Sequence, residues 1–376
     1  MKLLFITHCH GNYGASKSLQ LLLRNLVGHQ ITLIVPKGIR VKNNLEEIKE
    51  FYGKNVSEIK EFHLPFKYCY MGCPDLFIQK ASNMAINLLY KITSKRLIKY
   101  IEENDFDLIH LNAPVLYPVI NPDMPFIVHM RDVMLMEQEY AVKKVLQSRG
   151  IIFIDPGTRE PFKDKAIKNE IVLNNPFDMT TLGNYDESQI LDEYGIGSDS
   201  LIFSCIGRIK ESKGVEFVIE SFLKSRDNRK ILLIFGKGDS GSDYEERCKL
   251  MALNDARIRF IGEEKDIAKV YRISDYIIRG DPWHLIGRTV FEGLYSGCDV
   301  ILPGDDSDLE RNPDLNYFKD KLHLYSPRNV DALTLRIDSI SSKVKNRGFR
   351  SNVNEYVNKF NQFIKKVIAT DFTDKN

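Results

Sequence analysis

Two cations follow an apolar run in the second half of the chain, where residues 207–214 read GRIKESKG. Arg208 comes directly after the run 201–206, and Lys213 immediately precedes Gly214, where a helical pattern begins. A helix N-terminus has unsatisfied amides and a partial positive charge, so cations placed there favour a bound diphosphate. A single basic residue is more often a solvated surface cation. Arginine, lysine and glycine at this spacing together favour a phosphate site.

A second candidate segment is WHLIGRTVFEGLYSG, residues 283–297. The glycine, arginine and threonine at 287–289 suit a helix start, and the final glycine suits its C-terminal cap. Glu292 lies off the apolar stripe of this helix, on the same side as Arg288. One interpretation is a solvent-exposed pair between these two side chains. The other is that Glu292 holds a ligand. His284, eight residues earlier, is a candidate for contacting the same ligand.

Weaker candidates lie in the first half of the chain. The segment GNYGASKS, residues 11–18, follows the first apolar run, and Gly11 and Gly14 would let a phosphate or sugar approach the backbone before a helix that begins near residue 15. Polar residues also end two later runs: His110, Asn112, His129, Arg131 and Asp132. A histidine on a strand more often belongs to the core. The segment GKGDSG, residues 236–241, matches a dinucleotide-binding pattern, but its aspartate would repel a pyrophosphate, so a tight turn is the better interpretation.

Short apolar runs alternate with helical patterns along the whole chain, which predicts α/β architecture with parallel sheets and helices on both faces. The predicted strands are 3–7, 31–35, 107–111, 126–130, 151–154, 171–174, 201–206, 231–235, 257–261, 275–279 and 299–302. The polar stretch 176–199 interrupts this pattern and is expected to be a linker. We therefore expect two domains, 1–180 and 198–350, with a C-terminal helix at about 352–369 that crosses back to the first domain. Ligands bind beyond the carboxyl ends of such strands.

The composition is that of a globular protein, with 43% hydrophobic and 28% charged residues. A net charge of +2 argues against a general nucleic-acid binder. No signal peptide and no apolar run of membrane-spanning length is recognised. The six cysteines lack metal-ligand spacing and are expected to be reduced thiols of a cytoplasmic protein.

Taken in order, GRIKESKG, LLIFGKGD, RIRFIGEEKDIAKVYRISDYII and HLIGRTVFEGLYSGCDVIL resemble the donor-binding half of the retaining glycosyltransferases of family four. The first-half segments GNYGASKSLQLLLRNL, VHMRD and IVLNNPFD resemble the acceptor half of that family. The resemblance is specific over about 203–303 and loose over about 36–105. It implies the GT-B fold, in which two Rossmann-like domains face each other across a cleft.

The resemblance also implies roles for individual residues. Arg208 and Lys213 match the pair that neutralises the donor diphosphate, and Glu292 matches the glutamate that holds the ribose of the nucleotide. The remaining donor-side residues it implies are Gly14, Gly287, Arg288 and Thr289, while Asn112, Arg131 and Asp132 would lie on the acceptor side. The chain departs from the family at His284, where a glutamate usually contacts the donor sugar. No metal or other cofactor is expected.

The sequence therefore predicts transfer of a sugar from a nucleotide-sugar to an acceptor hydroxyl, with retention of configuration. Two alternatives remain open: an epimerase or phosphorylase on the same fold, and a sugar-nucleotide-binding subunit that has lost activity, for which His284 would be the sign. An imidazole both donates and accepts, unlike a carboxylate, so an active enzyme would use His284 for an altered donor sugar.

Residues 60–100 carry seven Lys or Arg, only two acids and interleaved aromatic residues. One interpretation is an ordinary helix pair with a solvated basic face. The other is a surface that contacts anionic lipid at the inner face of the cell membrane and so reaches a lipid-linked or glycan acceptor.

Overall fold

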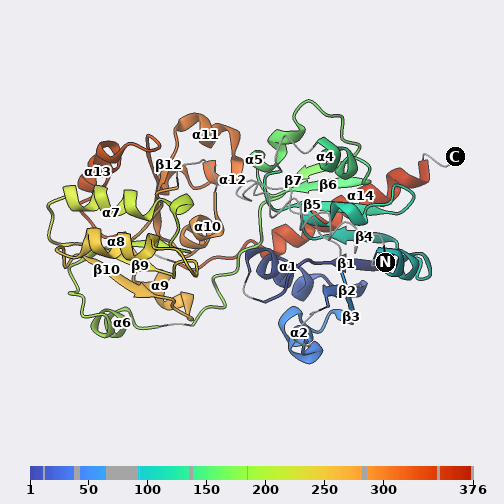
Figure 1. Ribbon diagram of the computed structural model, residues 1–376, viewed down its shortest axis with the longest axis horizontal. Helices are drawn as coiled ribbons and strands as arrows, with labels where there is room; N and C mark the ends of the chain where they lie inside the picture. Colours follow the sequence, from blue (N-terminus) through green and yellow to red (C-terminus); the bar gives the residue numbers. More distant parts are fainter. Residues whose placement is uncertain are drawn as a thin grey trace. The chain divides into compact units, whose positions relative to one another are not determined.

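The computed structural model describes residues 1–11, 13–37, 43–64, 92, 94–134, 139–183, 185–281, 286–344 and 348–373. The chain forms two compact units, each described here by itself (Figure 1). Unit 1 comprises Met1–Pro176 and Asn352–Asn376, and unit 2 comprises Phe177–Ser351. Among the described residues, no helix combines the length and the apolar character needed to cross a membrane.

Unit 1 is built on a parallel sheet with the strand order β3-β2-β1-β4-β5-β6-β7 in its described part. The order reverses between β1 and β4, which is the arrangement of Rossmann-type sheets. The strands are β1 (Lys2–Ile6), β2 (Gln30–Pro36), β3 (Val56–Phe62), β4 (Leu108–Leu111), β5 (Phe126–Met130), β6 (Gly150–Phe153) and β7 (Glu170–Val172).

Helices cover both faces of this sheet because its central strands are apolar on both sides. In β1, Leu3 and Phe5 pack on one face, whereas Leu4 and Ile6 pack on the other. The described helices are α1 (Gly14–Asn25), α2 (Leu45–Tyr52), η1 (Pro114–Val119), α4 (Glu139–Val145), α5 (Pro156–Arg159), η2 (Glu160–Phe162) and α14 (Val353–Thr373).

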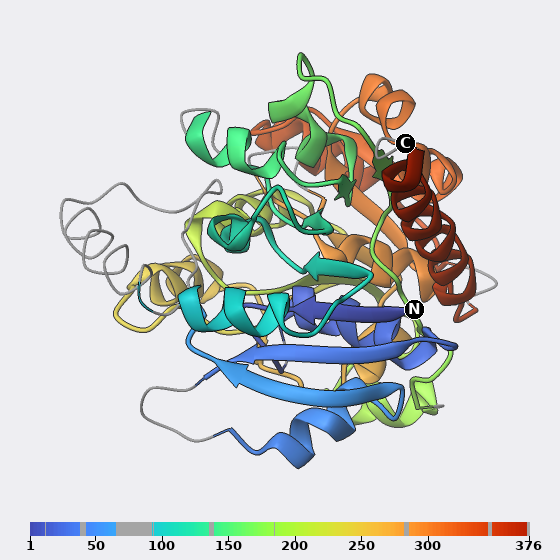
Figure 2. The same ribbon diagram turned by 90° about the vertical axis from the view of Figure 1, so that its right-hand side faces the viewer.

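The C-terminal helix α14 belongs to unit 1, although unit 2 separates it from the rest of unit 1 in sequence. It lies against α1 and runs along unit 1 as the dark red helix of Figure 2. An apolar stripe with helical spacing, which includes Tyr356, Phe360 and Val367, enters the unit 1 core. The approach is close, because a Cβ built on Gly150 at the start of β6 would lie 2.9 Å from the ring of Phe363.

Unit 2 has a second parallel sheet, with the described strand order β10-β9-β8-β11-β12-β13. Its order reverses between β8 and β11, so the two units share one topology. The strands are β8 (Leu201–Ile206), β9 (Lys230–Phe235), β10 (Ile258–Gly262), β11 (Tyr276–Ile278), β12 (Asp299–Pro303) and β13 (Leu322–Tyr325).

The helices of unit 2 also lie on both faces of their sheet, with α7 and α13 on one side and α6 and α9 on the other (Figure 1). The described helices are α6 (Glu187–Glu193), η3 (Glu211–Lys213), α7 (Val215–Lys224), α8 (Tyr244–Ala252), α9 (Ile267–Ile273), α10 (Arg288–Tyr295), α11 (Asp306–Arg311), α12 (Pro313–Asn316), η4 (Lys319–Lys321) and α13 (Val330–Ser339).

Most of the stretch expected to be a linker, 176–199, is instead packed into unit 2, which begins at Phe177. Phe177 and Met179 are buried in one core cluster, and Ile190 and Leu191 of α6 are buried in another. Ser188, Gln189 and Asp192 are exposed on the solvent side of the short helix α6, and this polar face makes the segment look like a linker in sequence.

Candidate functional site

The donor-side candidates of unit 2 gather where the strand order reverses. Arg208 and Lys213 follow β8, and the segment 279–281 follows the neighbouring strand β11. The topological switch point of an open α/β sheet is the place where ligands bind beyond the carboxyl ends of the strands. The structure thus brings residues from the GRIKESKG segment to the place where a ligand site is expected.

Two glycines allow the loops after β8 and β11 to touch. Gly214 has φ +60°, and a Cβ built on it would lie 1.8 Å from the carbonyl oxygen of Gly280. In the reverse direction, a Cβ on Gly280 would lie 2.1 Å from the carbonyl oxygen of Gly214. Because real Cβ atoms never approach backbone oxygens so closely, any other residue at either position would force the loops apart. The two glycines therefore hold the start of α7 against the end of β11.

A chain of polar contacts crosses this junction. The ammonium of Lys213 lies 3.3 Å from Oδ1 of Asp281. The other oxygen of Asp281 accepts from Nε of Arg279 at 2.6 Å and also contacts Nη2 of that residue. Nη1 of Arg279 donates to Oγ1 of Thr289, in the first turn of α10, at 2.7 Å. Lys213 is thus connected to the N-terminus of α10 through a buried ion pair.

Burial shapes the charges of this network. The side chains of Arg279 and Asp281 are 6% and 4% exposed, whereas that of Lys213 is 35% exposed and faces the surface. Burial first, and then the nearby charge of Arg279, lowers the pKa of Lys213, while Asp281 acts in the opposite direction. One carboxylate faces two cations, so the network keeps a net positive charge.

Arg208 differs from Lys213 in its surroundings. Its side chain is 68% exposed, and Nη1 donates to Oδ1 of Asp239 at 3.2 Å. Asp239 belongs to the GKGDSG segment, which lies beside the loop after β8 through a bridge between Ile209 and Gly238. The segment GKGDSG, interpreted as a tight turn, therefore contributes to the site, because its Asp239 carboxylate pairs with Arg208.

Helix α10 begins close to where the sequence predicted. Gly287 is its N-cap and gives no side-chain cap to the first-turn amides. A Cβ on Gly287 would lie 2.8 Å from Nη1 of Arg279, so the glycine also makes room for that guanidinium. The helix start therefore presents backbone rather than a capping side chain, which suits the approach of an anion.

Glu292 is held by two neighbours on the polar side of α10. Its Oε1 accepts from Nε of Arg288 at 3.1 Å, and its Oε2 accepts from the hydroxyl of Tyr271 at 2.9 Å. The Arg288 guanidinium also lies 4.7 Å from the centre of the Phe177 ring. The pair anticipated as the simpler interpretation thus exists, but it is not solvent-exposed, because Arg288 is 18% and Glu292 15% exposed. A carboxylate has about four acceptor positions, so Glu292 retains capacity for ligand hydroxyls.

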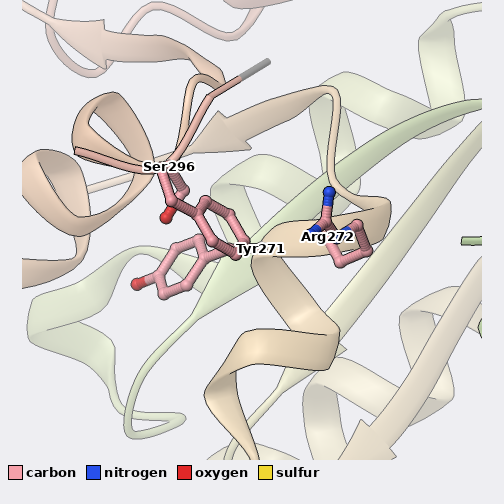
Figure 3. Close-up of a pocket in the computed structure, with 4 residues that line it drawn as sticks. Tyr271, Arg272 and Ser296 are labelled. Atoms are coloured by element: carbon pink, nitrogen blue, oxygen red, sulfur yellow. The ribbon is translucent and has the colours of Figure 1, made fainter. Parts of the chain in front are cut away.

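A small pocket of about 200 Å³ is lined by Tyr271, Arg272, Ser296 and Phe349. Figure 3 shows Tyr271 and Ser296 on one side of it and Arg272 on the other. The hydroxyl of Tyr271 is committed to Glu292, and burial raises the pKa of this phenol well above its usual value. Tyr271 is therefore a fixed hydrogen-bond donor rather than an acid or base.

In unit 1, residues that follow adjacent strands come together around Arg131. Gly14 is the first residue of α1, and Asn112 after β4 donates to the Ala15 carbonyl at 3.2 Å. Arg131 after β5 donates through Nε to Asn112 Oδ1 at 2.9 Å and through Nη1 to Asn175 Oδ1 at 2.5 Å. The start of α1 is thus joined in one network with Asn112 and Arg131, two of the three predicted acceptor-side residues.

Asp132, the remaining acceptor-side candidate, is exposed to solvent, whereas its neighbour Arg131 is buried. The two histidines of this region are also buried: His110 donates from Nε2 to Nδ1 of His129 at 3.2 Å, and Arg131 approaches the same nitrogen at 3.3 Å. Because a guanidinium only donates, His129 carries its proton on Nε2. Burial, and then the charge of Arg131, lowers the pKa of both imidazoles well below the usual value. They belong to the core, which was the expectation for strand histidines.

Several predictions fall on residues that the structure does not describe. His284 lies in 282–285, and most of the basic aromatic segment lies in 65–91, both outside the described residues. At the described ends of that segment, Lys60 pairs with Glu58 at 2.8 Å and lies 5.3 Å from the centre of the Tyr100 ring. Among the described residues, no group of three or more His, Cys, Asp or Glu side chains is arranged to hold a metal ion.

Sequence reasoning missed three of the residues that build the site: Arg279, Asp281 and Tyr271. The first two had a signal, because charged residues directly after a buried strand lie where ligands bind. Tyr271 had none, because an aromatic residue in an amphipathic helix normally belongs to the core.

Comparison with solved structures shows the fold. The chain can be superposed over its full length on HepE from Anabaena, solved with UDP, with a TM-score of 0.69, 14% identity and 99% of that chain covered. It is similarly related to sucrose-phosphate synthase from Thermosynechococcus elongatus, with a TM-score of 0.66, 14% identity and 100% and 98% of the two chains covered. The chain therefore has the GT-B fold, as predicted.

The sequence comparison is more specific for the second half. Residues 186–359 match the family described as Glycosyl transferases group 1. An uncharacterised glycosyltransferase of Methanocaldococcus jannaschii is 24% identical over 240 residues, which is 61% of this chain and 55% of that protein. The lipopolysaccharide core biosynthesis mannosyltransferase LpsB of Rhizobium meliloti is 22% identical over 142 residues, or 36% and 40% of the two chains. The chain thus spans about half the length of the curated relatives it matches.

Proposed function

We propose that this protein transfers a sugar from a nucleotide-sugar to an acceptor hydroxyl with retention of anomeric configuration. The observation that carries the proposal is the gathering of Lys213, the Arg279–Asp281 pair and the glycine-capped start of α10 at the switch point of unit 2. Cations and open backbone at a helix start suit a diphosphate. The match of residues 186–359 to the group 1 glycosyltransferase family supports the same class of reaction.

In this proposal the main catalytic effect is electrostatic. Negative charge builds on the departing nucleoside diphosphate as the bond to the sugar breaks. Lys213, Arg208 and the first turn of α10, at Gly287 and Thr289, would stabilise that charge without reorganisation, which is the usual source of large rate effects. Two cations can meet the charge of the diphosphate, so we propose a reaction that needs no bound metal. The departing phosphate would accept the proton of the acceptor hydroxyl.

Glu292 would hold the ribose of the donor nucleotide. Its carboxylate is fixed by Arg288 and Tyr271, so it loses little conformational freedom when it binds. The resemblance assigns this role to the matching glutamate of the family. A crystal structure of HepE contains UDP-glucose, which makes UDP a reasonable first nucleotide to try.

His284 would contact the donor sugar, as its position in the motif implies. We expect His284→Ala to lower turnover and to leave binding of the nucleoside diphosphate nearly unchanged, because Lys213 and Glu292 remain. His284→Glu should change the preference among donor sugars. If His284→Ala equalled the wild type on the best donor, the sugar contact would be ruled out.

The acceptor would bind to unit 1 near Asn112, Arg131 and Asp132, and Gly14 would lie on the donor side. A role in envelope polysaccharide or lipid-linked glycan synthesis is supported by relatives such as the mannosyltransferase LpsB. For such acceptors we propose a cytoplasmic enzyme that contacts anionic membrane lipid through residues 60–100. Liposome flotation tests this part, since binding that ignores anionic lipid and salt would contradict it.

The test of the function uses the full chain with a panel of UDP-, GDP- and other nucleotide-sugars, with and without a membrane lipid extract. A transferase releases nucleoside diphosphate when the extract is present, and NMR of the product reports the anomeric configuration. Conversion of the donor without an acceptor would indicate an epimerase. Binding without turnover across the panel would indicate an inactive binding subunit.

A further inference from the structure

The buried pair of Arg279 and Asp281 lies between the two parts of the proposed diphosphate site. Asp281 contacts Lys213 through one oxygen and Arg279 through the other, and Arg279 reaches Thr289 in α10. Neither Arg279 nor Asp281 faces solvent, with 5% and 4% of the residues exposed. Both side chains are too buried to be the main contact of a ligand at the surface. Each nevertheless contacts a residue of the proposed diphosphate site, because Asp281 contacts Lys213 and Arg279 contacts Thr289.

The backbone around this pair is built to accommodate it. A Cβ on Gly287 would lie 2.8 Å from Nη1 of Arg279, so the glycine leaves room for the guanidinium in its observed position. The hydroxyl of Tyr325, on β13, donates to the carbonyl of Arg279 at 2.6 Å and so fixes the backbone at the end of β11. The glycine contact between 214 and 280 brings the loop of Lys213 within reach of Asp281. Gly287, Tyr325 and the contact between Gly214 and Gly280 therefore all help to position the ion pair.

Burial of an ion pair is costly and in general gives little net stability compared with apolar residues. A pair kept at this position, in contact with both a phosphate-site lysine and the helix start, therefore suggests a role beyond packing. We infer that Arg279 and Asp281 are positioning residues, which set the location and the charge of Lys213 and fix the first turn of α10 for the diphosphate of the donor. The inference rests on the proposed function, because it assumes that Lys213 meets that diphosphate.

The two members of the pair should act on Lys213 with opposite sign. The charged groups that face its ammonium are Asp281 and Arg279 from the end of β11 and Lys210 from its own loop. Asp281→Asn removes the only negative charge among them, so the pKa of Lys213 should fall. Arg279→Gln removes a positive charge, so that pKa should rise. A pair with only a structural role would give no such opposite shifts, because damage to the fold weakens binding at every pH.

The experiment measures the affinity of the full-length protein for a nucleoside diphosphate by calorimetry between pH 7 and pH 10.5. The probe is whichever of UDP, GDP and ADP binds the wild type most tightly. Affinity should decline at high pH as Lys213 loses its proton. This decline should move to lower pH by about one unit or more in Asp281→Asn, and to higher pH in Arg279→Gln.

Two further variants separate charge from position. Lys213→Arg keeps a cation at every accessible pH, so the high-pH decline should disappear. Thr289→Val removes the hydrogen bond from Arg279 without any change of charge, so binding should weaken about five- to tenfold while the decline stays at the wild-type pH. Competitive amine labelling of Lys213, read by mass spectrometry, measures the same pKa changes without nucleotide.

The outcomes distinguish the inference from the proposed function. If the wild type binds none of the three nucleotides, both are overturned. If it binds one of them, but Asp281→Asn and Arg279→Gln shift the decline in the same direction or not at all, the positioning role alone is wrong. Should one of these two variants fail to fold, the sign of the shift in the other still decides.

Discussion

Replacing Lys213 with alanine removes the less exposed of the two cations that are proposed to meet the diphosphate. The change leaves Asp281 paired with Arg279 through its other oxygen, so no buried charge loses its last partner. Lys213 is 35% exposed and sits in a short 3-10 helix before α7, so truncation should not disturb the core. Any loss of nucleotide affinity can therefore be assigned to the diphosphate contact.

The magnitude follows from the surroundings of the two cations. A charge-assisted hydrogen bond contributes roughly 1.5–3 kcal/mol, which is about ten- to hundredfold in affinity or in kcat/KM. At 35% exposure, the side chain of Lys213 is better shielded from water than that of Arg208, so Lys213→Ala should lie at the upper end of that range. Arg208 is 68% exposed and already paired with Asp239, so Arg208→Ala should lie at the lower end, at about tenfold.

The assay is calorimetric binding of the preferred nucleoside diphosphate to the wild type, Lys213→Ala and Arg208→Ala, with far-UV circular dichroism to check the fold. Transfer kinetics should show the same order once a donor and an acceptor are known. Unchanged binding in both variants would refute the diphosphate assignment. A larger loss in Arg208→Ala than in Lys213→Ala would refute the reasoning from burial.

Three other predictions concern the two units separately. Gly214→Ala should destabilise unit 2 by more than about 2 kcal/mol in chemical denaturation, because the added Cβ has no room. Gly195 has nearly the same φ but open space around it, so Gly195→Ala should cost only about 1 kcal/mol. Equal costs for the two variants would contradict the contact between Gly214 and Gly280. Glu292→Gln should abolish any preference for a nucleoside diphosphate over its 2′-deoxy form in calorimetry, and a preserved preference would exclude the ribose contact. Burial lowers the pKa of His110 and His129, so these side chains are neutral in the folded state and take up protons on unfolding. Unit 1 should therefore lose roughly 2–3 kcal/mol of stability, measured by hydrogen exchange, when the pH falls from 7 to 5.5. A stability that does not change over this pH range would contradict the burial of neutral imidazoles.

The fold could be predicted because the central strands are continuous apolar runs separated by amphipathic helices. The run LIFSCI became β8, and the glycine, arginine and threonine at 287–289 mark the start of α10. Two edge strands, β3 and β13, were missed for a physical reason, whereas the edge strands β7 and β10 were predicted. β3 exposes charged side chains on the solvent face, so its sequence VSEIKEF lacks an apolar run, and β13 has only four residues.

The location of the candidate site could be predicted from the sequence, but the contacts between its residues could not. Arg208 and Lys213 are recognisable because they follow a strand and precede a helix. Their partners are not, because Asp239 looked like an obstacle to phosphate binding and Asp281 looked like a loop residue. The pairing of Asp281 with Lys213 depends on the backbone contact between Gly214 and Gly280. These glycines are 66 residues apart in the chain, so no local sequence pattern predicts their contact. Likewise, the simple Arg288–Glu292 pair could be foreseen, but the hydroxyl of Tyr271 from another helix could not.

The central claim is that Lys213 and the start of α10 bind the terminal phosphate of a nucleoside diphosphate. The most direct test compares the affinity of the wild type and of Lys213→Ala for the preferred nucleoside diphosphate and for its monophosphate. If the claim holds, the wild type prefers the diphosphate by about tenfold or more, and the variant loses most of that preference while its affinity for the monophosphate changes little. Equal preference in the two proteins would show that Lys213 does not meet that phosphate and would contradict the account.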